Sequence, residues 1–253
     1  MPSMMTDILA LNNTDLLLLI LICFFAGLIR GFSGFGLSAF VMSLSVTIIP
    51  PIELIPICWW MEFIAGVFMI KNGWKESDKG TSIVLWLGAI CGLPIGLFVT
   101  KILDVQISKF VALALILTLS VILFRNFKLH FLSSKLGTVC SGICAGIATG
   151  LASIGGLIVA TYVLASQNSA RRMRASLVVY ILLNSLTTFV FLIIFDVMDQ
   201  KALVRGVLLA LPSSIGVVLG SILFMQKLEK YYRPFSLGLL ITFCIVGLIR
   251  LIG

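Results

Sequence analysis

The chain has the stretch Arg30-Gly31-Phe32-Ser33-Gly34-Phe35-Gly36 in the middle of an apolar run that extends from Leu16 to Ile49. As one helix, at about 1.5 Å per residue, this run would be about 51 Å long, whereas the hydrocarbon core of a bilayer is about 30 Å thick. The run is therefore too long for one crossing and too short for two ordinary ones. Its three glycines, serine and arginine predict two short helices that meet at an unwound tip. Irregular backbone at membrane depth persists only where protein or a water-filled cavity satisfies its polar groups, so this tip is a candidate binding site.

A similar glycine-interrupted apolar run occurs 119 residues later, where residues 26–36 align without gaps on residues 145–155. Further along, residues 92–96 correspond to residues 216–220 at an offset of 124. Glycine-interrupted apolar segments at corresponding places in two halves are typical of the binding site of a transporter. We therefore predict one membrane domain, residues 1–253, that is built from two related halves, 15–126 and 131–253.

The composition excludes an ordinary soluble domain. Hydrophobic residues make up 60% of the chain and charged residues 11%, and the mean hydropathy is +1.18, as expected of an integral membrane protein. The net charge of +8 does not indicate a nucleic-acid partner, because the basic residues lie in short connections between apolar runs. The six cysteines lie inside these runs without metal-ligand spacing, and no nucleotide-binding loop is present. We expect no enzyme activity, no metal and no cofactor.

The chain is predicted to be all-α, with two glycine-rich returning hairpins, each followed by three membrane-spanning helices. This gives eight segments if each hairpin is counted once, and ten otherwise. The ten predicted segments are 15–30, 34–49, 52–70, 81–100, 107–125, 133–149, 154–166, 175–195, 202–224 and 234–252.

Basic residues predict the topology. If each hairpin returns to its starting side, one side of the membrane receives twelve basic residues and the other five, whereas hairpins that cross once give nine against eight. The cytoplasmic side carries the excess of Lys and Arg, so we predict returning hairpins, both termini outside, and inverted halves. The twelve residues are Lys71, Lys75, Lys79, Arg125, Lys128, Lys135, Arg171, Arg172, Arg174, Lys227, Lys230 and Arg233.

Three polar residues are candidates for transport chemistry. Arg30 is either an anion contact, helped by nearby backbone N–H groups, or a side chain that snorkels to the interface. Glu62 lies in the middle of a predicted span, where a carboxylate is costly unless it is paired or protonated. We interpret it as a proton-coupling group or as a structural partner of Arg30. At an offset of 122, Glu62 corresponds to Asn184, which we predict to face the same cavity.

The remaining candidates lie in the two tips. Small hydroxyl side chains and flexible backbone can bind an anion at a helix N-terminus, but small residues also serve helix packing alone. The predicted substrate-binding residues are Arg30, Ser33, Gly34, Phe35, Gly36, Ser153, Gly155, Gly156 and Asn184, with Glu62 as the proton-coupling group.

With these motifs the chain resembles the TauE/SafE family of sulfite exporters, whose members are bacterial permeases of two related halves that each open with a glycine-rich hairpin. The resemblance covers residues 15–252 and depends on residues 27–36, 146–157 and 170–184. It implies transport of a small sulfur-containing anion, such as sulfite, sulfoacetate or another organosulfonate, across the bacterial inner membrane. It favours export over uptake.

We therefore expect a secondary transporter that works by alternating access and is coupled to protons through Glu62. Its expected partners are a small anionic substrate and the lipid bilayer, and the sequence leaves a homo-oligomer open. Two alternatives remain: a membrane scaffold or accessory subunit in which the repeats only pack, and a passive anion channel.

Overall fold

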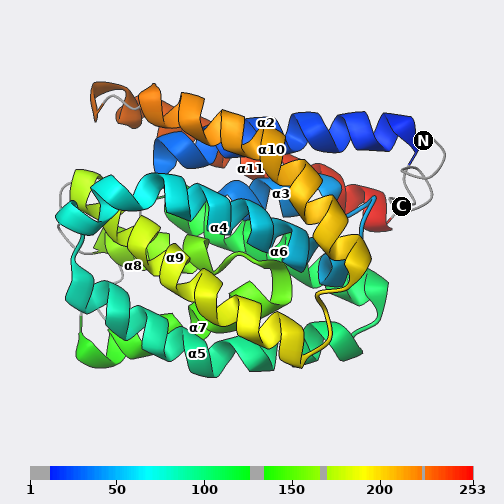
Figure 1. Ribbon diagram of the computed structural model, residues 1–253, viewed down its shortest axis with the longest axis horizontal. Helices are drawn as coiled ribbons and strands as arrows, with labels where there is room; N and C mark the ends of the chain where they lie inside the picture. Colours follow the sequence, from blue (N-terminus) through cyan, green and yellow to red (C-terminus); the bar gives the residue numbers. More distant parts are fainter. Residues whose placement is uncertain (1–11, 126–133, 166–169, 224–225, 253) are drawn as a thin grey trace.

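The computed structural model of the protein describes residues 12–125, 134–165, 170–223 and 226–252, and it forms ten helices in this part of the chain (Figure 1). The all-helical prediction is confirmed, and each predicted segment corresponds to one helix. The helices are α2 (Asn13–Ser33), α3 (Leu37–Ser45), α4 (Pro51–Glu76), α5 (Lys79–Ile102), α6 (Val105–Phe124), α7 (Lys135–Ala152), α8 (Gly155–Ala165), α9 (Ala170–Ile194), α10 (Gln200–Ile222) and α11 (Gln226–Ile252).

Among the described residues, six helices are long and apolar enough to cross a membrane, namely α2, α4, α5, α6, α9 and α10. The short arms of the hairpins differ from them. Helix α3 has 9 residues and α8 has 11, which at about 1.5 Å per residue is at most about 17 Å, too short to cross. The expectation of two short helices at the first tip is wrong for α2, which continues for 21 residues as far as Ser33.

Both tips are breaks in the helix at residues with positive φ. Helix α2 ends at Gly34, with φ 84°, whose N–H donates to the carbonyl of Arg30 at 2.8 Å, and Gly36 follows with φ 93°. Glycine adopts this conformation without the Cβ clash that other residues incur. In the second tip Ser153 takes the equivalent place with φ 57°, and its N–H donates to the carbonyl of Thr149 at 2.8 Å. The two tips therefore break their helices at equivalent residues.

The two halves exchange helices, because α2 packs on α10 and α5 packs on α7. A Cβ atom added to Gly27 of α2 would meet the carbonyl of Ser213, and one added to Gly146 of α7 would meet that of Ala89. The two contacts correspond to each other, because Gly146 lies 119 residues after Gly27 and Ser213 lies 124 residues after Ala89. Glycine lets two helix backbones approach this closely. The correspondence extends to three more pairs of contacts: Gly31–Val217 and Gly150–Leu93, Gly216–Phe24 and Gly92–Ile143, and Gly220–Leu28 and Gly96–Ile147.

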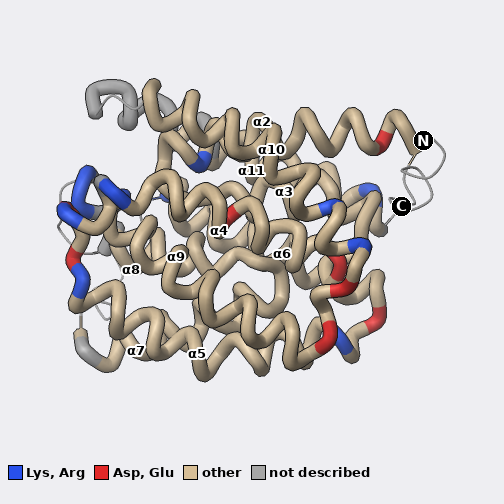
Figure 2. Tube along the Cα trace, viewed as in Figure 1, with Lys and Arg blue, Asp and Glu red and all other residues tan. Residues whose placement is uncertain are grey.

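The charged residues gather at the two ends of the bundle. Helix α2 begins and α3 ends at the end where both termini lie, whereas α7 begins and α8 ends at the opposite end (Figure 1). The opposite end carries mainly Lys and Arg, around the α4–α5 connection and the start of α9, and the terminal end carries charges of both signs (Figure 2). Of the twelve basic residues predicted for one side, Lys128 lies outside the described residues. Which end faces the cytoplasm stays a prediction.

Candidate functional site

A buried ion pair joins the first hairpin to α4. Arg30 lies in the last turn of α2, where its side chain is fully buried, and its Nε donates to Oε2 of Glu62 at 2.9 Å. The second carboxylate oxygen, Oε1, accepts a hydrogen bond from the hydroxyl of Ser38 at 2.9 Å, and the Ser38 N–H lies 3.4 Å away. Glu62 thus connects α2, α3 and α4 through hydrogen bonds to both of its oxygens.

Four of the five N–H donors of this arginine are unused within the described part of the chain. Nη1 and Nη2 of Arg30 are buried and have no partner among the described residues. An unsatisfied buried donor costs about 1–3 kcal/mol, and more when it is charged. The snorkelling interpretation of Arg30 is wrong for this structure, because the guanidinium is buried inside the bundle. The pairing of Glu62 with Arg30 agrees with the interpretation of Glu62 as a partner of this arginine.

The second half repeats this contact with uncharged side chains. At the two sequence offsets, Thr149 corresponds to Arg30 and Asn184 to Glu62, and the Asn184 Nδ2 donates to the Thr149 Oγ1 at 3.4 Å. The Thr149 hydroxyl in turn donates to the carbonyl of Ala145 at 2.8 Å. The Oδ1 atom of Asn184 is buried and has no partner among the described residues. The two halves therefore hold one charged and one neutral version of the same contact.

A cavity of about 30 Å³ lies between α4, α9 and the second tip. A cavity needs about 10–15 Å³ to hold a water molecule, so this one has room for about two. It is lined by Trp59, Glu62, Thr149, Ser153, Gly155, Gly156, Tyr180, Ile181, Asn184, Ser185 and Thr188.

The lining of this central cavity combines hydrogen-bonding groups with the start of a helix. Gly155 and Gly156 are the first residues of α8, and the first N–H groups of a helix have no partner within it and favour an anion. The hydroxyl of Tyr180 is buried and has no hydrogen-bond partner within the described ranges. The Trp59 indole closes one side by donating to the carbonyl of Ser185 at 2.7 Å. The site offers polar groups for a small anion, with the carboxylate of Glu62 on its wall.

A family model described as sulfite exporter TauE/SafE matches residues 19–247. The chain belongs to the TauE/SafE family. This is a family of membrane transporters of sulfur anions and not of enzymes, so the TauE/SafE protein described here is a multi-pass membrane transporter. No curated protein and no solved structure matches the chain.

The first tip of this TauE/SafE protein does not line the central cavity. The hydroxyl of Ser33 donates to the carbonyls of Ile29 at 2.8 Å and Phe35 at 2.7 Å, so it stabilises the tip itself. Ser33, Phe35 and Gly36 line a separate, apolar cavity of about 20 Å³. Gly34 instead packs against Arg174 of α9, which donates to the carbonyl of Gly31.

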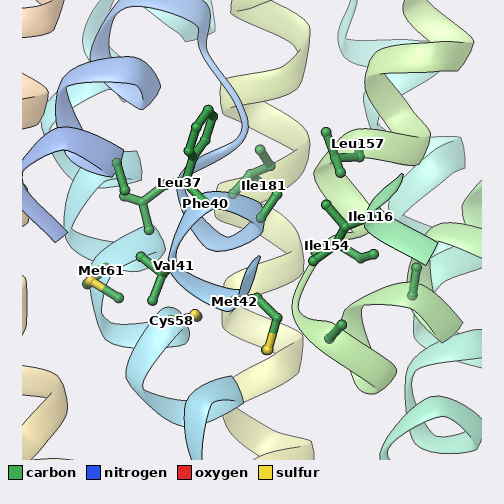
Figure 3. Close-up of a cluster of buried hydrophobic side chains, with 14 of the residues drawn as sticks. Leu37, Phe40, Val41, Met42, Cys58, Met61, Ile116, Ile154, Leu157 and Ile181 are labelled. Atoms are coloured by element: carbon green, nitrogen blue, oxygen red, sulfur yellow. The ribbon is translucent and has the colours of Figure 1, made fainter. Parts of the chain in front are cut away.

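An apolar layer lies between the first tip and the second tip of the TauE/SafE fold. Figure 3 shows Leu37, Phe40 and Met42 of α3 facing the same cluster as Ile154 and Leu157 of the second hairpin. The predicted residues therefore fall into two groups. Ser153, Gly155, Gly156, Asn184 and Glu62 share one cavity, whereas Ser33, Phe35 and Gly36 share another.

Sequence reasoning missed several polar residues of the site. Tyr180 lies four residues before Asn184, which places both on one face of α9, and this spacing was the available signal. Ser38 and Thr149 gave none, because small hydroxyl residues are common in membrane helices as packing residues. Their roles depend on side-chain directions that only the folded hairpins define.

Leucine at either tip should abolish transport by this TauE/SafE protein while the chain still inserts. A Cβ atom at Gly155 would lie closer than 3.0 Å to the Thr149 hydroxyl and the Ala145 carbonyl, and one at Gly34 would lie 2.6 Å from Cγ of Arg174. We expect at least a tenfold loss of anion exchange in proteoliposomes for Gly155→Leu and Gly34→Leu. The matched control is Gly36→Ala, because its nearest neighbour is 3.9 Å away and only backbone strain of about 1–2 kcal/mol is added. Normal exchange by both leucine variants would contradict a role of the tips.

Proposed function

We propose that the protein is a secondary transporter that moves a small sulfur oxyanion or organosulfonate across the bacterial inner membrane. The single observation that carries this proposal is the buried Arg30–Glu62 pair, with an N–O distance of 2.9 Å, beside the polar central cavity. A charged pair in the middle of a membrane protein is costly, and such pairs mark transport pathways. Family membership supports the class of substrate.

The anion would bind in the central cavity next to the N-terminus of α8. As long as Glu62 is ionised, its charge compensates Arg30 and repels an incoming anion from the cavity wall. Protonation of Glu62 would neutralise the carboxylate and leave the positive charge of Arg30 uncompensated beside the cavity. Charge interactions are strong in such a low-dielectric site. One proton would therefore enter the site with one negative charge, which couples the anion to the proton gradient.

Alternating access requires that two similar units rock about the bound substrate. The exchanged helix pairs, α2 on α10 and α5 on α7, join the halves at both sides, and α4 packs on α9 between them. We propose that the halves are inverted repeats and that α4 and α9 move against each other at the central cavity. The central cavity has a volume of about 30 Å³, which suits an occluded state before the substrate enters. We place both termini outside the cell.

The two alternative functions fit these observations less well. A scaffold that only packs has no need of a fully buried arginine with two nitrogens that lack a partner in the described ranges. A passive channel needs a continuous polar path, and the central cavity has room for about two water molecules. We therefore retain the carrier as the function and expect it to work without an additional cofactor.

Ligand binding and counterflow together test this function. Purified protein should show a higher melting temperature in the presence of sulfite, sulfoacetate or methanesulfonate, because a ligand that binds only the native state stabilises it. Proteoliposomes loaded with the stabilising anion should take up the labelled anion faster than empty ones, since a carrier shows trans-stimulation. Chloride and acetate serve as control anions. Uptake that is the same in loaded and empty vesicles would indicate a channel, and no stabilisation by any sulfur anion would contradict the proposed substrate class.

A further inference from the structure

A second cavity, much larger than the central one, opens at the end of the bundle where both termini lie. Its volume is about 150 Å³, about ten times what one water molecule requires, so it has room for a small oxyanion. We call it the vestibule. It lies between the start of α4, the end of α5 and the α9–α10 connection, and its lining is Ile52, Glu53, Lys101, Asp196, Val197, Asp199, Lys201, Ala202 and Arg205.

The vestibule contains a second ion pair, whose two partners differ in burial. Nη1 of Arg205 lies 2.7 Å from Oε2 of Glu53, and the exposed fraction of the side chain is 7% for the arginine and 50% for the glutamate. The arginine is therefore fixed inside the protein, whereas the glutamate reaches it from the surface. The Glu53 carboxylate thus takes the position at which an external anion could bind to the buried guanidinium. Guanidinium groups bind carboxylates and other oxyanions with the same planar donor geometry.

The charges of the lining favour an exchange of anions at Arg205. Three cationic side chains, from Lys101, Lys201 and Arg205, face three acidic ones, from Glu53, Asp196 and Asp199. The lining is formally neutral in this arrangement. If the Glu53 side chain moves out into solvent, an excess of one positive charge remains, which matches a singly charged anion.

Two other charged groups of the lining, one acidic and one basic, are engaged elsewhere. Asp199 caps α10, since its Oδ1 accepts a hydrogen bond from the Ala202 N–H at 2.6 Å. Lys101 donates through Nζ to the carbonyl of Phe195 at 2.7 Å. Breaking either contact would free a helix terminus or a loop. Of Glu53 and Asp199, Glu53 is thus the one whose departure costs the fold less.

We propose that Arg205 is the anion-binding residue of an entry site, at which a singly charged sulfonate or hydrogen sulfite replaces the carboxylate of Glu53. This inference rests on the proposed transport function and adds a second site to it. Glu53 and Glu62 lie nine residues apart on α4, or about 13.5 Å along the helix axis. Trp60 lies between them and packs against Gly206 of α10.

The opposite end of α4 has an ion pair of a different kind. Arg171 donates through Nε to Glu76 at 2.6 Å, but the exposed fractions of the two side chains are 64% and 30%. The arginine is largely solvated and the glutamate is partly solvated, and such surface pairs contribute little. The cation of this pair is exposed and not buried, so the entry site is assigned to the terminal end.

The charge of a thiol reagent can report the anion preference of the vestibule. In the variant Glu53→Cys, we compare a methanethiosulfonate reagent that carries a sulfonate with one that carries a trimethylammonium group. At Glu53→Cys, the ratio of the labelling rate of the sulfonate reagent to that of the trimethylammonium reagent should be about ten times the ratio at Gln106→Cys. Gln106 is an exposed control position at the start of α6. The ratio changes because one unit charge nearby affects the two reagents in opposite directions. The unsubstituted protein gives the background from the native cysteines.

Adding a second substitution to Glu53→Cys tests Arg205 itself. Arg205→Gln should remove the tenfold preference, whereas Arg205→Lys should keep it, because lysine retains the charge. Methanesulfonate should slow labelling by both reagents when Arg205 is present and should give little protection with Arg205→Lys, which lacks the planar fork. In the complete protein, Glu53→Gln should lower the KM for anion entry from this side several-fold.

An unchanged reagent preference after Arg205→Gln, or labelling that methanesulfonate does not slow, would overturn the entry site. The lysine variant shows whether loss of preference in Arg205→Gln reflects charge or misfolding. Because labelling needs no transport, failure of the entry site can be distinguished from failure of the proposed transport function. A protein that neither binds nor exchanges any sulfur anion would overturn the proposed function, and normal exchange with unchanged labelling would overturn the entry site alone.

Discussion

Glu62→Gln should abolish the accumulation of anion that is driven by a pH gradient, while binding and exchange between two filled compartments remain. Glutamine keeps the shape and the hydrogen bond from Ser38, whose hydroxyl lies 2.9 Å from the carboxylate, but it cannot titrate. It also leaves Arg30 without a counter-charge, and breaking a buried ion pair costs about 3–5 kcal/mol. We therefore expect a lower melting temperature without ligand and a larger stabilisation by the substrate anion than in the unsubstituted protein. Proteoliposomes with labelled anion, with and without a pH gradient, measure both activities.

The second half of the chain supplies the matched control for this variant. The double substitution Arg30→Thr with Glu62→Asn copies the Thr149–Asn184 contact into the first half and removes both buried charges at once. The double substitution leaves no uncompensated buried charge, which is the main cost of breaking such a pair, so the double variant should fold but bind the anion weakly. Accumulation retained by Glu62→Gln would exclude the proton role. Loss of exchange together with accumulation would mean that Glu62 only holds Arg30 in place.

Gly146→Leu should destroy the packing of α7 on α5. A Cβ atom at this position would lie 2.8 Å from the Ala89 Cα and 2.8 Å from the Leu93 nitrogen, and these are backbone atoms that cannot rotate away. Overpacking costs about 1–3 kcal/mol where side chains can adjust, and more where the backbone must move. At 2–4 °C for each kcal/mol, we expect the melting temperature to fall by roughly 10 °C or more and the yield of monodisperse protein to drop sharply.

Gly238→Leu is the control for the helix-packing variant, because no atom lies within 4 Å of the Cβ position at Gly238. It should leave the melting temperature within about 2 °C of the starting protein, since leucine is also the better helix former. Fluorescence-detected size exclusion after heating measures both variants in detergent. Equal melting temperatures for the two leucine variants would contradict the close α5–α7 contact.

The sequence predicted the order and approximate bounds of the helices, because the apolar runs and their glycine breaks are strong local signals. It also predicted that Arg30 corresponds to Thr149 and Glu62 to Asn184. In the structure Arg30 contacts Glu62, and Thr149 contacts Asn184. These residues could be paired from the sequence alone, because the offset between corresponding residues of the two halves changes little along the chain.

The prediction of one site at two meeting tips was less successful. Helix α2 continues to Ser33, so Arg30 points from a helical turn into the bundle instead of lying on the unwound tip. The side chains of α3 then fill the space between the tips with apolar groups (Figure 3). The direction of a side chain near a helix end depends on where the helix stops, and a glycine-rich stretch leaves that point open by several residues. The vestibule could not be predicted, since its lining comes from three distant parts of the chain.

The exchange of helices between the halves has a consequence for synthesis and insertion. The glycine face of α2 is covered by α10, which begins about 190 residues later in the chain, and at 5–20 residues per second this delay is roughly 10–40 s. During that time the nascent first half would expose its glycine faces to lipid or to the insertion machinery. The halves are therefore expected to be degraded when expressed separately and to assemble when expressed together. In the complete chain, the contacts between the halves form only near the end of translation.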